Sequence, residues 1–148
     1  MSKKETWRLR EYWQQTGGLL IEEFMMVRKK HDGSVGRRLL DGLIILGEET
    51  AAAETKDISI EGKDIIVVQV KGGRLGMYLM GQAYFSGLLL KKLKPRSIKV
   101  VAICARSDIE MEKLCQEHDI EVVVIPVHIP VHREHLIRFI VNTYSGKP

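Results

Sequence analysis

The feature that most constrains the fold is one short run, residues 64–71, which reads Asp-Ile-Ile-Val-Val-Gln-Val-Lys. Its apolar residues are consecutive and mostly β-branched, a pattern typical of a strand buried on both faces. Such a strand needs other elements packed above and below its sheet. The run therefore predicts a sheet flanked by helices.

Segments with helical and strand patterns alternate along the rest of the 148-residue chain. Further strands are expected at residues 37–46, 57–61, 98–104 and 121–125, with a turn at 62–63 that makes 57–61 and 64–71 a hairpin. Helices are expected over residues 5–30 (broken near 17–18), 76–93, 108–118 and 132–144. The last strand–helix–strand unit should be parallel. The order α, three antiparallel strands, α, β, α, β, α predicts one α/β domain, residues 1–148, with a mixed sheet.

Composition narrows the classes of protein. Apolar residues make up 45% of the chain and charged residues 28%, which is ordinary for a folded globular protein. There is no run of about 18 uncharged apolar residues, so we expect no membrane partner. Cys104 and Cys115 are too few for a disulfide framework or a four-ligand zinc site. A cytoplasmic protein with two core thiols is the expectation.

The net charge of +4 hides a strong asymmetry along the chain. No Asp or Glu occurs from Lys71 to Ser107, a stretch that holds eight Lys or Arg residues. A second basic set lies at residues 28–38, and the segment between the two, residues 48–64, is acidic. Two basic segments flanking an acidic one favour a surface that follows phosphates. The simpler alternative is that each charge run only solvates a surface.

Polar residues stand in two strands that are otherwise apolar. Gln69 and Lys71 leave the same face at the end of their strand. Asp41 interrupts the apolar run 39–45, where a carboxylate needs a cation, hydrogen bonds or a raised pKa. Gly42 beside it lets another group come close. In an antiparallel meander the ends of these strands can lie side by side, so Asp41, Gln69 and Lys71 can converge at one edge of the sheet.

This set of side chains suits metal-assisted phosphodiester hydrolysis. Asp41 and the amide oxygen of Gln69 would hold Mg²⁺ or Mn²⁺, which prefer oxygen ligands. The metal would polarise the phosphate and help to ionise a water, which Lys71 would orient or deprotonate. Glu23 lies nearer than Glu22 to the apolar stripe of the first expected helix, so Glu23 is the candidate for a further carboxylate. The structural alternatives are ion pairs, of Asp41 with Arg37 or Arg38 and of Glu23 with an arginine.

The acidic first helix, Asp41–Gly42, the strand end Gln69-Val-Lys71 and a following helix with Gln82 resemble the PD-(D/E)xK nuclease superfamily. The resemblance covers roughly residues 15–105. Glutamine stands where that superfamily more often has Asp or Glu, and no proline precedes Asp41. The Gln-x-Lys form is similar to Mrr-type restriction endonucleases.

The resemblance implies a restriction-endonuclease-like three-layer α-β-α core, αβββαβ with an αβα extension, and a Mg²⁺- or Mn²⁺-dependent DNA endonuclease. Asp41, Gln69, Glu23 and the backbone carbonyl of Val70 would form its metal site, with Lys71 beside them. Gln82 would lie near the phosphate or the lysine. The expected nucleic-acid contacts are Arg37, Arg38, Arg74, Gln82, Lys91, Lys92, Lys94 and Arg96. Because one small site cannot cut both strands at once, a homodimer is expected, with a protein partner as a further means of targeting.

Two other functions fit the same residues. Gln69 in place of an acid favours a non-catalytic nucleic-acid-binding or assembly module on the same scaffold. A small α/β domain that binds a protein partner would need its basic residues only for solvation. Three histidines, His128, His132 and His135, have spacing compatible with zinc, but prolines at 126 and 130 interrupt that segment, so surface histidines are the better interpretation.

Overall fold

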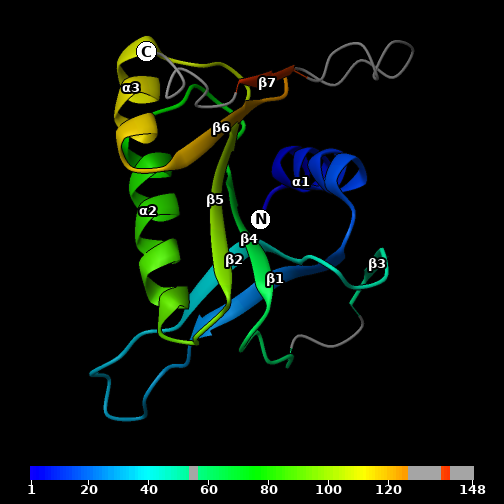
Figure 1. Cartoon of the computed structure of the whole chain (residues 1–148). Helices are drawn as coiled ribbons and strands as arrows, with labels where there is room; N and C mark the ends of the chain where they lie inside the picture. Colours follow the sequence, from blue (N-terminus) through cyan, green and yellow to red (C-terminus); the bar gives the residue numbers. More distant parts are fainter. Residues whose placement is uncertain (54–56, 127–137, 141–148) are drawn as a thin grey trace.

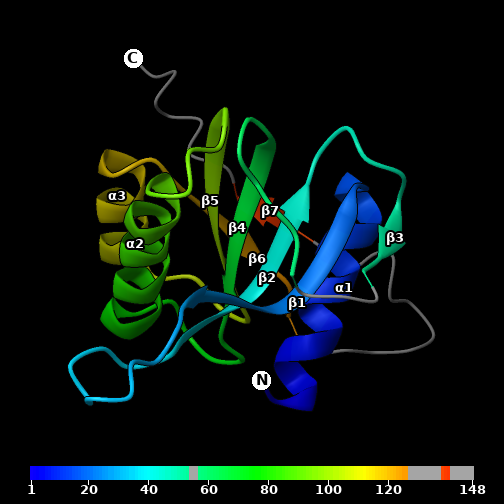
Figure 2. The ribbon, with the colours of Figure 1, turned by 90° about the horizontal axis from the view of Figure 1, so that it is seen from below.

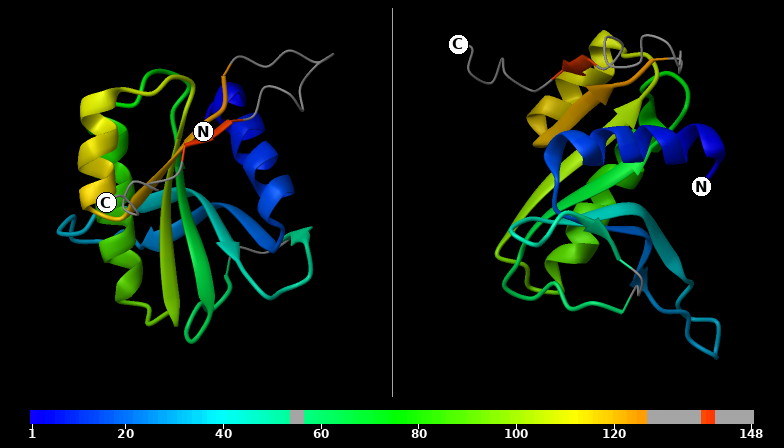
Figure 3. Two further views of the ribbon diagram at one scale, coloured as in Figure 1. Left: turned by 45° about the horizontal axis from the view of Figure 1, so that its top comes forward. Right: turned by 90° about the vertical axis from the view of Figure 1, so that its right-hand side faces the viewer.

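The computed structural model in Figure 1 describes residues 1–53, 57–126 and 138–140. A single seven-stranded sheet runs through the described chain in the order β3-β1-β2-β4-β5-β6-β7. Helices α2 (Met77–Lys91) and α3 (Ile109–Glu117) cover one face of this sheet, and α1 (Lys3–Thr16) covers the other, as Figures 2 and 3 also show. The predicted α/β class with a helix-flanked mixed sheet is confirmed.

The sheet is antiparallel in its first half and parallel in its second. Strands β1 (Leu19–Val27), β2 (Arg38–Ile45) and β4 (Asp64–Val70) form an antiparallel meander. Strands β4, β5 (Ser97–Cys104) and β6 (Ile120–Val124) are parallel neighbours. The short strands β3 (Ala51–Ala52) and β7 (Arg138–Ile140) close the two edges. The strands predicted at 37–46, 64–71, 98–104 and 121–125 and the helices at 76–93 and 108–118 are thus confirmed to within about two residues.

Strand β4 lies at the centre of the core, as its apolar run predicts. Every residue from Ile65 to Val70 is buried. Ile66 and Val68 pack in the cluster with Leu9 and Tyr12 of α1, whereas Ile65 and Val67 pack in the cluster with Leu90 of α2. Each such side chain contributes roughly 1.5–3 kcal/mol when it leaves water. The alternation along β4 assigns its side chains to the two helical layers.

The prediction of helix over residues 5–30, broken near 17–18, is confirmed as far as Thr16 and is wrong beyond it. Gly17 and Gly18 have φ angles of 73° and 94°, which end α1, and the chain then enters β1. The spacing at residues 20, 23, 24 and 27 fits a helical stripe, but Leu20 packs toward α1 and Ile21 packs in the cluster on the opposite face. Apolar residues directed to both sides are buried by a strand that lies between two helical layers, so pairing with β2 makes this segment a strand.

Two further predictions about elements need correction. Residues 57–61 form no strand, because the turn at Gly62 (φ 73°) directs them toward the end of α2, where the Gly62 N–H donates to the Lys94 carbonyl at 2.9 Å. The third strand of the meander is β1 instead. The helix expected over residues 132–144 is wrong at 138–140, which pair with β6 as β7. The rest of that prediction and all three of His128, His132 and His135 lie outside the described residues.

Candidate active site at the end of β2 and β4

The site begins where two central strands separate. The pairing of β2 with β4 ends at Gly42 and Val68, one residue before Asp41 and Gln69. The backbone N–H of Val70 then donates to the Asp41 carboxylate at 2.9 Å instead of to a carbonyl of β2. Asp41 therefore accepts a hydrogen bond from a backbone N–H that has no partner on β2 where the pairing of the two strands ends.

Gly42 lets helix α1 approach this point closely. A Cβ atom at Gly42 would lie 2.5 Å from the Leu9 Cδ1 atom, so no other residue fits without movement. The prediction that Gly42 admits another group is confirmed, and that group is a side chain of α1. The same helix carries Glu5 in its first turn, and the Glu5 charge acts on Asp41.

The surroundings of Asp41 disfavour the charged form of its carboxyl group. Burial raises the pKa of Asp41 above its usual range, and the neighbouring charge of Glu5 raises it further. The hydrogen bond from Val70 and the charges of Lys71 and the N-terminal ammonium act in the opposite direction. A half-buried carboxylate beside a like charge is stabilised when a cation binds next to it.

Lys71 follows directly on the residue that Asp41 binds. Its backbone N–H donates to the Ile103 carbonyl at 2.9 Å, which extends the pairing with β5 by one residue. Its ammonium lies 4.8 Å from the centroid of the Tyr78 ring on α2. The ammonium of Lys71 therefore lies at the first turn of α2, and its charge acts on Asp41.

Gln69 faces α2 and contacts a different partner from Asp41. Its side chain is buried, and its amide nitrogen donates to the Ser86 hydroxyl oxygen at 2.8 Å. In the described part of the chain no hydrogen bond joins Gln69 to Asp41. The structure thus brings Asp41, Val70 and Lys71 together, and it places the Gln69 amide against α2.

Glu23 lies on strand β1, so the expectation of a helical carboxylate is wrong. Glu23 falls between the paired residues Glu22–Gly42 and Phe24–Leu40, which puts it beside Asp41 on the adjacent strand. Its φ of 54° marks an irregular point in β1, and its carboxylate accepts a hydrogen bond from the Met1 ammonium at 3.1 Å. Glu22 forms the pair with an arginine, because Arg10 donates to it at 2.7 and 3.0 Å.

Sequence reasoning missed Glu5 as a neighbour of Asp41. The available signal was Ser2-x-x-Glu5, a capping box that starts α1 and is formed in the structure, with the Ser2 N–H donating to Glu5 at 3.1 Å. That motif fixes where the helix begins. It does not show that the first turn of the helix packs against the end of β2.

The donors at this point could hold one hard cation. Among the described residues no group of three or more His, Cys, Asp and Glu is placed to form a closed metal cage. Mg²⁺ is commonly held by one or two carboxylates, with waters and substrate phosphates completing its shell. Asp41, with its raised pKa and with Glu23 beside it on the next strand, fits that open kind of site.

The basic residues predicted to contact nucleic acid lie in two places. Arg74 follows Lys71 before α2, whereas the set at residues 91–96 lies at the other end of α2, about 20 Å away along a helix of 15 residues. Arg96 is held by Asp64 through both Nε and Nη2, and this contact lowers the pKa of Asp64 to about 2. All of these basic residues are exposed, namely Arg37, Arg38, Arg74, Lys91, Lys92, Lys94 and Arg96. No ion pair joins Asp41 to Arg37 or Arg38 within the described residues.

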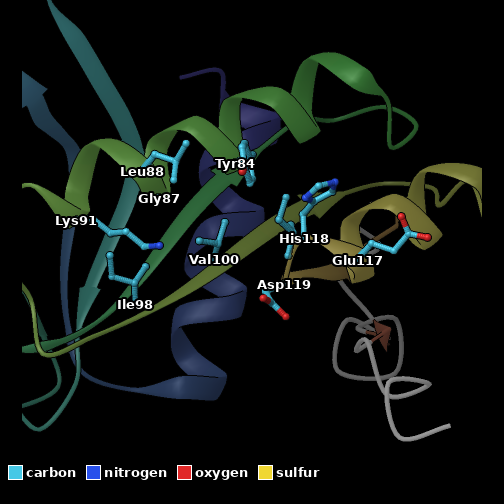
Figure 4. Close-up of a pocket in the computed structure, with 10 residues that line it drawn as sticks. Tyr84, Gly87, Leu88, Lys91, Ile98, Val100, Glu117, His118 and Asp119 are labelled. Carbon is cyan, nitrogen blue, oxygen red and sulfur yellow. The ribbon is translucent and has the colours of Figure 1, made fainter. Parts of the chain in front are cut away.

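Two pockets flank α2. The first, which we call the α2 pocket, has a volume of about 470 Å³ and is lined by Met26, Arg38, Leu39, Gln69, Met77, Tyr78, Gly81, Gln82, Phe85, Ser86 and Leu89. The second has a volume of about 350 Å³ and lies where α2 meets α3 and β5. Figure 4 shows His118 beside Tyr84 in it, with ring centroids 5.3 Å apart, and Glu117 directed away. Of these two pockets, the α2 pocket includes Tyr78, the neighbour of Lys71.

Comparison with protein-family models, with curated proteins and with solved structures finds no match to this chain. None of the helices in the described residues combines the length and the apolar character that crossing a bilayer requires.

Proposed function

We propose that this protein is a metal-dependent DNA endonuclease built on a restriction-endonuclease-like core. The observation that carries the proposal is the Asp41 carboxylate, bound to the Val70 N–H where β2 and β4 separate, with Lys71 as the next residue. The order of the elements supports it, because α1, β1, β2, β4, α2 and β5 follow the αβββαβ pattern that the resemblance implies.

Each residue has a distinct part in the proposed reaction. Asp41 would hold the metal, and its hydrogen bond from Val70 fixes the carboxylate in position. Mg²⁺ or Mn²⁺, when bound, supplies polarisation of the phosphate and a more acidic water. Lys71 lies close enough for its charge to act on Asp41, so its ammonium would orient the attacking water, or accept the proton of that water once the ammonium has lost one of its own. Glu23 would add a second negative charge from the adjacent strand.

Gln69 has a positioning part in this proposal. Its amide nitrogen is held by Ser86, so the amide supports the packing of α2 against β4 near Lys71. With one charged ligand fewer than an acidic residue would supply, the site would bind its metal weakly and depend on the substrate phosphate for full affinity. The dependence on the phosphate is expected because Mg²⁺ usually retains several waters and coordinates phosphate oxygens of the substrate.

The substrate and the assembly are part of the same proposal. The exposed basic residues Arg37, Arg38 and Arg74 would contact DNA phosphates near the site, and Lys91, Lys92 and Lys94 would do so at the far end of α2. Cuts in both strands would need a homodimer or a partner protein. The buried free thiols Cys104 and Cys115 suit the reducing cytoplasm.

Nicking of supercoiled plasmid in Mg²⁺, Mn²⁺ or EDTA tests the proposal. The wild type should nick in either metal and not in EDTA, and Asp41→Asn should abolish the reaction. Lys113→Ala is a matched control, because Lys113 is an exposed lysine on α3. Loss of nicking in Lys113→Ala as well, or nicking by Asp41→Asn at the wild-type rate, would contradict the assignment.

A second candidate function is a non-catalytic nucleic-acid-binding module. The contact between Gln69 and Ser86 favours it, because the amide nitrogen of the motif's glutamine is bound to a residue of α2. This function predicts salt-dependent DNA binding that needs no metal and is unchanged in Asp41→Asn. The same plasmid, used at several salt concentrations in a gel-shift assay, separates the two functions.

A further inference from the structure

The α2 pocket combines aromatic rings, amide groups and positive charge beside Lys71. Gln69, Gln82 and Ser86 line it with polar groups, and Tyr78 and Phe85 line it with rings. Its volume of about 470 Å³ falls within the range of small-molecule sites. The connection between β1 and β2 extends past α2 in Figures 1 and 2, and Arg38 at its end reaches the same pocket.

The rings of this pocket are unusually accessible for side chains of their kind. Tyr78 is 66% exposed, Phe85 is 61% exposed and Met77 is 78% exposed. Helix α2 is apolar on all sides, with no charged residue from Met77 to Leu90, although only one side packs on the sheet. An apolar helix face of this kind marks a binding surface.

The polar groups of the pocket can recognise a planar ligand. Gln82 and Ser86 are one helical turn apart on α2, and Ser86 binds the buried Gln69 amide at 2.8 Å. Glutamine amides offer a donor and an acceptor in one plane, which matches the edge of a nucleobase. An exposed aromatic ring beside such amides offers a face on which a base can stack.

The charge around the pocket has one sign. No Asp or Glu is among its lining residues, Arg38 is one of them, and the Lys71 ammonium lies 4.8 Å from the ring centroid of Tyr78. This charge suits a ligand that carries a phosphate next to an aromatic base. An apolar protein partner would need no cations at the rim.

We propose that the α2 pocket binds one unpaired nucleobase of a DNA strand, stacked on Phe85 and contacted by the amides of Gln82 and Gln69. The adjacent phosphate would then face Lys71 and Arg38. Insofar as that phosphate is the one cut at Asp41 and Lys71, the inference rests on the proposed function. The substrate class is DNA with single-stranded or unpaired positions rather than a perfect duplex.

Fluorescence anisotropy of a labelled single-stranded oligonucleotide, measured in EDTA so that no cleavage occurs, tests the pocket. Phe85→Leu keeps an apolar side chain and removes the ring, so affinity should fall about 5- to 150-fold, the range for one stacked base. Leu88→Ala is the matched control, because Leu88 is an exposed apolar residue of the same helix that does not line the pocket. Its affinity should match that of the wild type, and affinity for a perfect duplex should change little in either variant.

The outcomes separate this proposal from the proposed function. Wild-type affinity in a folded Phe85→Leu protein, checked by circular dichroism, would overturn the base pocket, as would equal losses in Phe85→Leu and Leu88→Ala. If both variants instead convert a dimer into a monomer in sedimentation without changing oligonucleotide affinity, the exposed face of α2 is a dimer surface and the proposal is wrong. A specific loss in Phe85→Leu with no plasmid nicking by the wild type would support the pocket and contradict the endonuclease.

Discussion

The hydrogen bond from Val70 to Asp41 allows the structural and chemical roles of this carboxylate to be separated. Asp41→Asn and Asp41→Ala both remove the negative charge. Only Asn keeps an oxygen that can accept the Val70 N–H. The two variants should therefore lose plasmid nicking alike and differ in stability.

The size of the stability difference follows from the bond. Ala would leave the N–H of Val70, which is fully buried, without an acceptor, and a buried unpaired donor costs about 1–3 kcal/mol. With a typical urea dependence for a small protein, the unfolding midpoint of Asp41→Ala should lie about 1 M below that of Asp41→Asn. The fluorescence of Trp7 and Trp13, which pack against the core cluster at α1, reports the transition.

The pH dependence supplies a second test of the same residue. Because the pKa of Asp41 is raised in the folded state, the folded protein keeps a proton that the unfolded chain has already lost. Stability that involves this group is therefore lost as the pH rises from the ordinary value of 3.8 through the raised pKa, and the loss is complete above it. Relative to the wild type, Asp41→Asn should gain stability over that interval and be at least as stable at pH 7.

Two results would refute this reasoning. If Asp41→Asn and Asp41→Ala have the same unfolding midpoint, the hydrogen bond from the Val70 N–H to Asp41 does not contribute to the free energy of unfolding. If Asp41→Asn is less stable than the wild type at pH 7 and the difference grows with pH, the carboxylate is stabilised by its surroundings in the folded state.

Three further predictions concern neighbouring parts of the chain. Gly42→Ala should lower the free energy of unfolding by about 1–3 kcal/mol because its Cβ would lie 2.5 Å from Leu9, whereas Gly81→Ala, in open space on α2, should raise it by up to about 1 kcal/mol in the same urea titration. Ser86→Ala should cost about 1 kcal/mol because it removes the acceptor of the Gln69 amide, and an unchanged midpoint would show that this contact is weak. Lys92→Ala should reduce the salt dependence of DNA binding by about one phosphate contact. Arg96→Ala should leave the salt dependence unchanged, because Asp64 already binds that guanidinium. Equal slopes of log affinity against log salt in both variants would contradict this difference.

The parts of the fold that could be predicted are those with a strong local signal. The sequence predicts both the strand β4 and the helix before Pro95 correctly, because an apolar run and a helix-breaking proline are signals within a few neighbouring positions. Strand β1 could not be assigned in this way. Its residues 20, 23, 24 and 27 match a helical stripe, and only pairing with β2, a long-range contact, makes them a strand.

The site was predictable in its residue types and only partly in its geometry. The odd placement of Asp41 and Lys71 in apolar strands showed that both need partners. The alternation of β4 put Gln69 and Lys71 on one face, but it could not show that Ser86 of α2 would bind Gln69. Nor could it show that an irregular strand, with Glu23 at a φ of 54°, would lie beside Asp41.

The most direct test of the central claim is the initial rate of plasmid nicking in Mn²⁺ by the wild type, Lys71→Ala and Lys113→Ala, each at saturating DNA as verified by binding in EDTA. If Lys71 acts in the reaction next to Asp41, Lys71→Ala should lose at least 100-fold in rate, the usual contribution of a positioned proton-transfer group, while Lys113→Ala keeps the wild-type rate. Equal rates of nicking by the wild type and Lys71→Ala, or no metal-dependent nicking by the wild type, would contradict the account.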